Sequence, residues 1–367
     1  MMNKANRVMN FSGGPAVLPL EVLEQARSEL FNYRNSGASV MELSYQAEEY
    51  LALQAEALAD VRRVLDVPEG WQVLFCQGGG NMQFSAVPLN LMGLKPKGRG
   101  AYVNSGNFSS RALKEAGRYG PVDEVASSRD TLFDRIPEFD PAGLHPDTAY
   151  VHITSNNTVM GTQWPEIPRL EGFPLVVDAT SELMSRPLDF SRIGLIYAGA
   201  QKNLGPPGLT VVIVREDLLG HARGDTPKLL DYTRLARENS MLCTPNTFAI
   251  YISGLVFKWI LAQGGVEEMQ QRALKRSGLV YEMLDRHSGF YRPHSRPEHR
   301  SCLNATFRLP TEGLEKSFLD EARQQGMSGL KGHKVLGGIR ASMYNGLPVE
   351  WAAALAGFMD EFARRKG

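Results

Sequence analysis

The hydrophobic positions of the chain fall into short apolar runs that alternate with amphipathic stretches. The runs rich in β-branched residues are typical of buried strands and lie at residues 100–103, 150–153, 175–177 and 210–214. The spacing of apolar positions predicts long amphipathic helices over 21–33 and 45–65. This alternation predicts an α/β fold with a mostly parallel sheet, helices on both of its faces and ligands at the carboxyl ends of its strands.

The pattern changes after a predicted helix over 250–264. From there the chain forms a smaller α+β unit, with strands predicted at 304–309 and 338–342 and helices at 314–325 and 349–365. We therefore predict three parts. An N-terminal arm over residues 1–16 packs with the smaller unit, a large domain covers 17–260, and a small C-terminal domain covers 261–367.

The charge balance, the apolar stretches and the cysteines limit which binding partners and which cellular compartment we expect for the protein. The 367 residues carry 40 Lys and Arg against 40 Asp and Glu, so nothing favours nucleic acid or an anionic membrane as a partner. No apolar stretch is long enough to span a bilayer, and residues 1–7 lack the apolar core of a signal peptide. Cys76, Cys243 and Cys302 are odd in number, widely spaced and without a metal-binding pattern. We expect a reducing cytoplasm and no metal ion.

The candidate chemistry starts with Lys202, which follows the apolar run 195–199 in a loop of glycine and proline. A lysine held at the carboxyl end of a core strand is poorly solvated, which favours the neutral amine that attacks a carbonyl. A surface lysine is the alternative. Upstream, the apolar strand 173–178 ends in Asp178. This pair fits a pyridoxal-phosphate enzyme, in which the lysine forms the Schiff base and the aspartate keeps the pyridine nitrogen protonated.

A glycine-rich turn supplies a third part of the predicted site. The apolar run 73–76 leads into Gln-Gly-Gly-Gly-Asn at 77–81 and then into a helix predicted to start near residue 82. Glycines before a helix let backbone N–H groups approach a phosphate, and the helix dipole favours the anion. The turn is not a Walker loop, because no Gly-Lys-Ser/Thr follows. The order of cradle, aspartate and lysine along the chain suits a cofactor that carries a phosphate.

The chain resembles the phosphoserine aminotransferase family in several segments, namely residues 10–16, 83–90, 198–203, 253–259, 331–333 and 337–342. The resemblance runs from about residue 8 to the C-terminus. It implies a fold-type I, class V pyridoxal-phosphate transaminase with a mostly parallel, seven-stranded sheet in the large domain. The family is normally a homodimer with active sites at the subunit interface. It makes 3-phosphoserine from 3-phosphohydroxypyruvate, with glutamate as the amino donor.

The resemblance implies how the cofactor phosphate would be held. Gly80 and Asn81 would offer backbone N–H groups, helped by Gln201. Thr244 would reach the same phosphate from the neighbouring subunit. A helix cap ahead of Pro245 is the alternative role for Thr244.

The resemblance also implies contacts to the cofactor ring and the substrate. Thr158 corresponds to the residue that hydrogen-bonds the ring hydroxyl, and Phe108 stands where the family usually has a stacking Trp. Asp178 and Lys202 match the ring-nitrogen partner and the Schiff-base lysine. Arg340 matches the residue that grips the substrate α-carboxylate as a bidentate fork.

The residues that bind the substrate phosphate in the family are changed in this chain. Where the family has Ser-His-Arg, the chain reads Ser44, Tyr45 and Gln46, and Asn81 replaces the arginine of the glycine-rich turn. A hydrogen bond to a charged group contributes roughly 1.5–3 kcal/mol, so the loss of two arginines predicts much weaker binding of a dianion.

Some positive charge remains near the predicted substrate pocket. His333 matches a family histidine near the phosphate, and Lys334 replaces the arginine that follows it. Arg111, one turn beyond Phe108, stands where the family usually has a small residue. Arg111 either reaches into the pocket or lies on a solvated helix face.

These observations favour an aminotransferase of this family whose substrate has a neutral polar side chain in place of the phosphate. An ordinary phosphoserine aminotransferase is the alternative. A second alternative is another pyridoxal-phosphate reaction on the same fold, such as elimination, decarboxylation or racemisation. Retention of Lys202, Asp178 and Arg340 argues against a protein without enzymatic activity.

Overall fold

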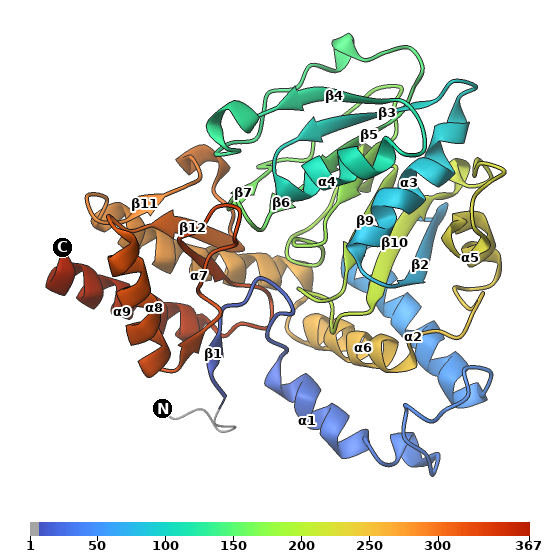
Figure 1. Cartoon of the computed structure of the whole chain (residues 1–367). Helices are drawn as coiled ribbons and strands as arrows, with labels where there is room; N and C mark the ends of the chain where they lie inside the picture. The colour runs from blue at the N-terminus through green and yellow to red at the C-terminus, as the bar shows by residue number, and fades with distance from the viewer. Residues whose placement is uncertain (1–6) are drawn as a thin grey trace.

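The computed structural model describes residues 7–367, and its largest sheet has seven strands in the order β2-β10-β9-β8-β5-β3-β4 (Figure 1). The strands are β2 (Trp71–Gln77), β3 (Arg99–Asn104), β4 (Val122–Ser127), β5 (Thr148–Thr154), β8 (Leu175–Asp178), β9 (Leu195–Gly199) and β10 (Leu209–Arg215). Strand β10 is antiparallel to β2 and β9, and the other neighbours are parallel. The predicted α/β fold with a mostly parallel sheet is confirmed.

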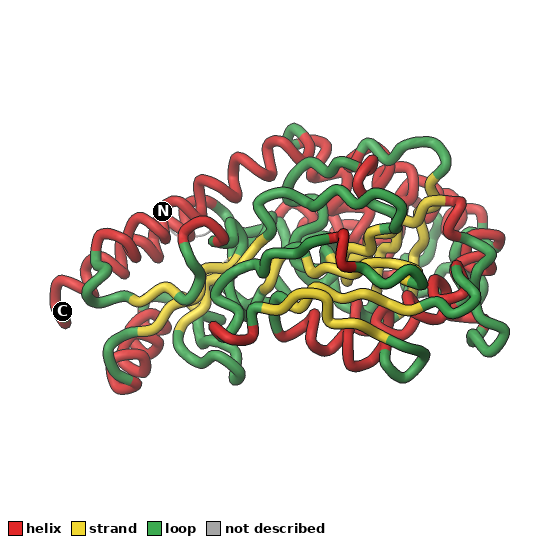
Figure 2. The backbone as a smooth tube through the Cα atoms, turned by 90° about the horizontal axis from the view of Figure 1, so that it is seen from above, coloured by secondary structure: helices red, strands yellow, loops and turns green. Residues whose placement is uncertain are grey.

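Helices cover both faces of this sheet, which forms a central layer in Figure 2. The covering helices are α1 (Leu20–Glu29), α2 (Glu48–Leu65), α3 (Gln83–Leu91), α4 (Asn107–Ala116), α5 (Tyr232–Arg237) and α6 (Thr247–Ala262). Alternate residues of a strand point to opposite faces. In β2, Val73 and Phe75 pack in the core that includes α1, α2 and α6, whereas Leu74 and Cys76 pack in the core that includes α3, α4 and α5. Burial on both faces explains the continuous apolar runs in the sequence.

Two predicted helices are shorter than the sequence pattern indicates. Helix α1 ends at Glu29, and Asn32 has an extended backbone with φ −149° and ψ 88°, which a right-handed helix does not accommodate. Helix α2 begins at Glu48, after a turn closed by the hydrogen bond from the Ala47 N–H to the Ser44 carbonyl. Tyr45 and Gln46 therefore lie in that turn and outside the helix.

A second sheet lies in the C-terminal part of the chain and is three-stranded and antiparallel, with the order β11-β12-β14. Its strands are β11 (Arg292–Pro293), β12 (Asn304–Arg308) and β14 (Ile339–Ser342), and its helices are α7 (Gly265–Arg286), α8 (Glu312–Gln324) and α9 (Val349–Lys366). The short strand β1 (Met9–Asn10) pairs in parallel with β13 (Met327–Ser328), and Phe11 is buried in the core of this part. The division at residues 16 and 260 stays a prediction, and residues 1–6 of the predicted arm lie outside the described residues.

Within residues 7–367, no single helix is both long and apolar enough to cross a membrane, although α6 and α7, bent by 85°, match together by length and composition. The same residues include no group of three His, Cys, Asp or Glu placed to hold a metal ion.

Candidate active site

Lys202 lies just beyond the carboxyl end of β9, in a turn that leads to β10. The turn is fixed by backbone hydrogen bonds, among them 2.8 Å from the Gly205 N–H to the Ala200 carbonyl. The lysine is 7% exposed, and its Nζ donates a hydrogen bond to Oγ1 of Thr158. Nζ also lies 5.7 Å and 5.6 Å from the ring centroids of Phe108 and Tyr344. The predicted nucleophile is therefore an enclosed amine and not a surface lysine.

Asp178 ends β8 beside this lysine and is 5% exposed. Its Oδ1 accepts a hydrogen bond of 3.0 Å from the backbone N–H of Thr180. Burial raises the pKa of Asp178, against hydrogen bonds from Thr180 and Tyr197 and the charge of Lys202, which lower it. A buried carboxylate of this kind gains strongly from a cationic N–H partner, as a protonated pyridine provides.

A buried polar network supports Asp178 from behind the cavity, and sequence reasoning missed it. Tyr197 hydrogen-bonds Asp178, and the hydroxyl of Tyr197 lies 3.0 Å from Nε2 of His152. The ring of His152 stacks on Tyr102 at 4.9 Å, and the hydroxyls of Tyr102 and Tyr150 are 2.7 Å apart. Burial lowers the pKa of His152 to about 3, so the imidazole is neutral at ordinary pH. The network fixes the carboxylate without adding a charge.

The glycine-rich turn lies against the lysine loop. A 3-10 turn at Gly80–Met82 precedes α3, close to the predicted helix start. A Cβ on Gly80 would stand 2.7 Å from Oγ1 of Thr180, and one on Gly199 would stand 3.0 Å from the Gly80 nitrogen and 2.5 Å from Oε1 of Gln201. Only glycine fits at these two positions, and the resulting close approach leaves backbone N–H groups next to the cavity.

These elements enclose one cavity with a volume of about 130 Å³. It is lined by the seven residues predicted to bind the cofactor within one chain: Gly80, Asn81, Phe108, Thr158, Asp178, Gln201 and Lys202. Sequence reasoning missed four polar residues that also line it: Thr154, Asn156, Thr180 and Ser181. Their position just after β5 and β8 was the available signal, because the carboxyl ends of parallel strands meet at one edge of a sheet.

Arg340 lies on β14, and its guanidinium packs against Gly13 of the N-terminal arm. Its Nε is buried and has no hydrogen-bond partner within residues 7–367, and burial lowers its pKa. The buried Tyr344 lies close to both Arg340 and Lys202 and was not predicted. Burial alone would raise the pKa of Tyr344, but neighbouring cations and hydrogen bonds bring it below the usual value.

Three predicted basic residues form an electrostatic group with Arg340. Burial lowers the pKa of His333, and three neighbouring cations lower it further: Arg340, Lys334 and Arg111. The Cζ of Arg111 lies 5.6 Å from the ring centroid of Phe108, which is a wall of the cavity. The positive charge left in the sequence therefore gathers near Phe108 and Arg340, of which Phe108 lines the cavity and Arg340 does not.

Three other predicted residues do not line the cavity of their own chain. Tyr45 packs against the core of the large sheet, and Gln46 is exposed in the turn before α2. Thr244 is exposed, and its carbonyl accepts a hydrogen bond from Nε2 of Gln77. The cap of α6 is Asn246, whose side chain accepts from the Ala249 N–H, so the alternative role of Thr244 as a cap is not seen. Contacts of these residues with a second subunit stay predictions.

The Aminotransferase class-V family model matches residues 8–350. The chain belongs to the class-V aminotransferase family. It is 49% identical to the phosphoserine aminotransferase of Geobacillus kaustophilus over 98% of this chain and 99% of that protein. It is 48% identical to the phosphoserine aminotransferase of Chromobacterium violaceum, with the same coverage.

Solved structures place this class-V aminotransferase in the same fold. The phosphoserine aminotransferase of Bacillus circulans subsp. alkalophilus superposes with a TM-score of 0.95 at 43% identity, over 98% of this chain and 99% of that one. The pyridoxal-phosphate-bound phosphoserine aminotransferase of Trichomonas vaginalis superposes with a TM-score of 0.91 at 35% identity, over 96% and 99%. The predicted family, the fold-type I class and the transaminase activity are confirmed.

The residues present fit pyridoxal phosphate, the cofactor of this class of transaminase. An enclosed amine, a buried carboxylate and an aromatic wall surround the cavity, and a glycine turn closes one end of it. The predicted cofactor is therefore confirmed for this class-V enzyme. The role of each residue stays a prediction.

Proposed function

We propose that this class-V enzyme is a phosphoserine aminotransferase, which transfers the amino group of glutamate to 3-phosphohydroxypyruvate and so forms 3-phosphoserine and 2-oxoglutarate. The relatives at 45–49% identity over nearly the whole chain carry this name. They support the alternative that the sequence left open better than the predicted change to a substrate with a neutral side chain. The observation that carries the proposal is the basic group beside the cavity, because it supplies the charge that a phosphorylated substrate needs.

The substrate phosphate would bind at His333, Lys334 and Arg111. These residues share one electrostatic environment with Arg340, although they come from different parts of the fold. Arg111 is exposed on α4 and free to turn toward the cavity edge, where Phe108 already holds its guanidinium face. An arginine on α4 would then replace the charge that Asn81 does not supply. A phosphate dianion in turn stabilises the protonated form of His333, whose pKa is lowered when no anion is bound.

The substrate carboxylate would bind at Arg340. Its Nε is buried without a partner, so a carboxylate would complete its hydrogen bonding as a bidentate acceptor. Because β14 and the Gly13 backbone fix this guanidinium, the substrate would be held at both ends, by Arg340 at the carboxylate and by the basic group at the phosphate.

Bound pyridoxal phosphate supplies an electron sink for the bond broken at the substrate Cα. Lys202 would hold the aldehyde carbon and, once released, its amine would move the proton at Cα, for which its enclosed position beside Thr158 is suited. Asp178 would keep the ring nitrogen protonated, and Phe108 would fix the ring plane. Replacing Lys202 with Ala is expected to abolish turnover while leaving some cofactor bound, as measured by dialysis and absorption.

We also propose a cytoplasmic homodimer with shared sites. Phe31, Met41 and Leu51 are 86%, 55% and 40% exposed, and they lie in the same part of the chain as Tyr45 and Gln46. Apolar side chains exposed together favour a protein partner, and a second copy would cover them. All three cysteines are free, in keeping with a reducing compartment.

An altered substrate is the second candidate function, and one observation favours it. The positions that carry charge in the family are neutral here. Asn81 lines the cavity, whereas Tyr45 and Gln46 lie in a turn that would contribute to the active site of the partner subunit. A hydroxyl- or amide-bearing amino acid would suit such a pocket.

The two candidates are separated by mixing cofactor-loaded protein with single amino acids and following the visible absorption of the bound cofactor. A rapid change with phosphoserine and glutamate supports the proposal. No change with these two and a rapid change with serine or asparagine would overturn it in favour of the second candidate.

Two variants that each remove one arginine charge test where the substrate phosphate binds. Arg111→Gln is expected to lower kcat/KM for phosphoserine about tenfold. This is the lower end of the loss expected on removing a hydrogen bond to a charged group, and we choose it because Arg111 is exposed. Activity with alanine should change less than twofold. Arg118→Gln removes the same charge from an exposed position paired with Glu115 and is the matched control. Equal effects of both variants on phosphoserine would place Arg111 outside the site.

A further inference from the structure

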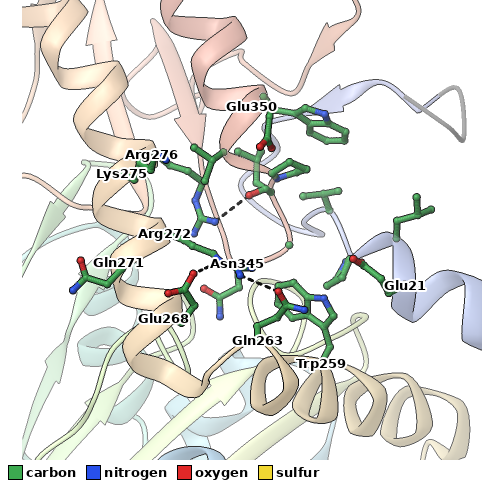
Figure 3. A pocket seen from close by; sticks show the side chains of 18 of the residues that line it. Glu21, Trp259, Gln263, Glu268, Gln271, Arg272, Lys275, Arg276, Asn345 and Glu350 are labelled. Carbon is green, nitrogen blue, oxygen red and sulfur yellow. Dashed lines mark hydrogen bonds and ion pairs between the residues drawn. The ribbon is translucent and has the colours of Figure 1, made fainter. Parts of the chain in front are cut away.

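A second cavity with buried polar walls lies outside the cofactor cavity, between α1, α6, α7 and the segment at residues 345–351 (Figure 3). It has a volume of about 820 Å³. Four cations and three carboxylates line it: Arg7, Arg272, Lys275, Arg276, Glu21, Glu268 and Glu350. Arg272 forms an ion pair of 2.7 Å with Glu268, so these two charges neutralise each other.

Arg276 is the unusual member of this wall. It is on α7, has no exposed surface, and uses Nη1 to donate a hydrogen bond of 3.0 Å to the Leu347 carbonyl. Its Nε and Nη2 are buried and have no hydrogen-bond partner within residues 7–367. Within the same described range, no Asp or Glu carboxylate forms an ion pair with the Arg276 guanidinium. Burial lowers the pKa of Arg276 to about 10, so the group is still charged at neutral pH. A buried charge without a counter-ion is costly and attracts an anion.

The unpartnered edge of Arg276 is the edge that arginines use to bind carboxylates. In Arg99, Nε and Nη2 lie 2.5 Å and 2.6 Å from the two carboxylate oxygens of Asp123. In Arg223, the same two nitrogens bind both oxygens of Asp225 at 3.0 Å and 2.9 Å. Arg276 therefore has a complete bidentate donor pair without an acceptor.

The rest of the wall suits an organic anion better than an inorganic one. Nε1 of Trp259 is a second buried donor without a partner, and it lines the same cavity. Apolar groups make up much of the remaining wall: Val17, Leu20, Leu347, Pro348 and Trp351. Polar and apolar side chains contribute about equally to this wall, so an organic carboxylate can contact both kinds.

We propose that this cavity binds a small organic carboxylate, with its two oxygens on Nε and Nη2 of Arg276 and its apolar body against Trp259 and Leu347. Both nitrogens are covered by protein in the structure, so the ligand displaces a lining side chain as it binds. Lys275 and Gln271 line the cavity and are exposed, so they can move without breaking the core.

The site adjoins the catalytic loop through Asn345, which lines the cavity. The backbone N–H of Asn345 donates a hydrogen bond of 3.1 Å to Oδ1 of Asn203, the residue after Lys202. Its side-chain Nδ2 donates one of 2.7 Å to the carbonyl of Met184. The cavity therefore shares Asn345 with the contacts that hold the lysine loop.

Benzoate and its neutral isostere benzamide are suitable probes. The titration uses the cofactor-loaded Arg340→Gln enzyme, because that background removes carboxylate binding at the active-site arginine. We expect one saturable benzoate site per chain by calorimetry and a rise in Tm with benzoate. Benzamide should bind at least tenfold more weakly.

The variant Arg276→Met, made in the same background, should weaken benzoate binding at least tenfold. It should keep the fold, since replacing an unpaired buried charge by an apolar chain of similar length is often tolerated. If it does not fold, Trp259→Phe keeps the ring, removes only the second donor, and should weaken binding several-fold. Absence of saturable benzoate binding, equal binding of benzamide, or unchanged affinity in the variant that folds would overturn the proposal.

Discussion

Replacing Gly13 with alanine tests Arg340 as the residue that binds the substrate carboxylate. A Cβ on Gly13 would stand 2.4 Å from Nη2 and 2.6 Å from Cζ of Arg340. Gly13 does not have a positive φ, so the alanine backbone is unstrained and the new contact alone determines the effect. The atoms that must move are the far end of a flexible side chain, so the substitution should displace the guanidinium without unfolding the protein.

The size of the effect follows from that displacement. Carbon atoms in contact lie about 3.5–4.0 Å apart, so the guanidinium must retreat by roughly 1 Å. A misplacement of this size costs up to about 100-fold in rate, which corresponds to about 2.7 kcal/mol. That agrees with the roughly 1.5–3 kcal/mol of a hydrogen bond to a charged group. We therefore expect kcat/KM for phosphoserine to fall roughly 30- to 100-fold, with little change in Tm.

The assay is a double-mutant cycle on kcat/KM with Gly13→Ala, Arg340→Ala and the two combined. If alanine acts through the guanidinium, the double variant is no worse than Arg340→Ala alone, because the group that would be displaced is already gone. Gly357→Ala in α9, where an added Cβ meets nothing within 4 Å, is the matched control and should keep the parent rate. A loss below threefold for Gly13→Ala, or losses that simply add in the double variant, would refute the reasoning.

Two further predictions concern the cofactor cradle and the network behind Asp178. Gly80→Ala places a Cβ 2.7 Å from Oγ1 of Thr180 and should weaken cofactor binding at least tenfold in a fluorescence titration, whereas Gly79→Ala, with open space around it, should have a smaller effect. The pKa of His152 is lowered to about 3, so below about pH 6.5 the unfolded chain takes up a proton that the folded one refuses, and stability falls as the pH drops. This group should make the free energy of unfolding, measured with urea, about 2 kcal/mol lower at pH 5 than at pH 7. His152→Gln should reduce that difference, and an unchanged difference would contradict the role of His152.

The sequence predicted six of the seven strands of the large sheet, because these strands are buried on both faces and read as apolar runs. Strand β4 was not predicted, since none of its residues is fully buried. The same logic located Asp178, Lys202 and the glycine turn, since each directly follows such a run. The pairing of β1 with β13 could not be predicted from the sequence, because strands of two residues have no periodicity to detect. The end of α1 and the start of α2 were misplaced for a related reason, since the extended backbone of Asn32 and a turn hydrogen bond at Ala47 bound these helices without changing the apolar pattern.

The residues that sequence reasoning missed share a physical cause, which is that they act through contacts made by distant segments. Tyr344 belongs to the site only because β14 brings it beside Lys202, more than a hundred residues away in sequence. His152 and Tyr197 have apolar neighbours in their strands and look like ordinary core positions until the fold pairs them behind Asp178. A side chain whose role is set by a neighbour from another element leaves no local signal.

The basic group beside Phe108 shows how a site can keep its charge while changing the positions that carry it. Asn81 leaves the glycine turn neutral, yet Arg111 stands on α4 next to the same cavity wall, within electrostatic reach of His333. Electrostatic binding of a phosphate depends on the distance and burial of the charges and only weakly on which element presents them. Under the proposed function, Arg111 would take over the charge of the arginine that Asn81 replaces, which a comparison of matched positions does not detect. This is why the neutral residues at Tyr45, Gln46 and Asn81 do not by themselves argue for a neutral substrate.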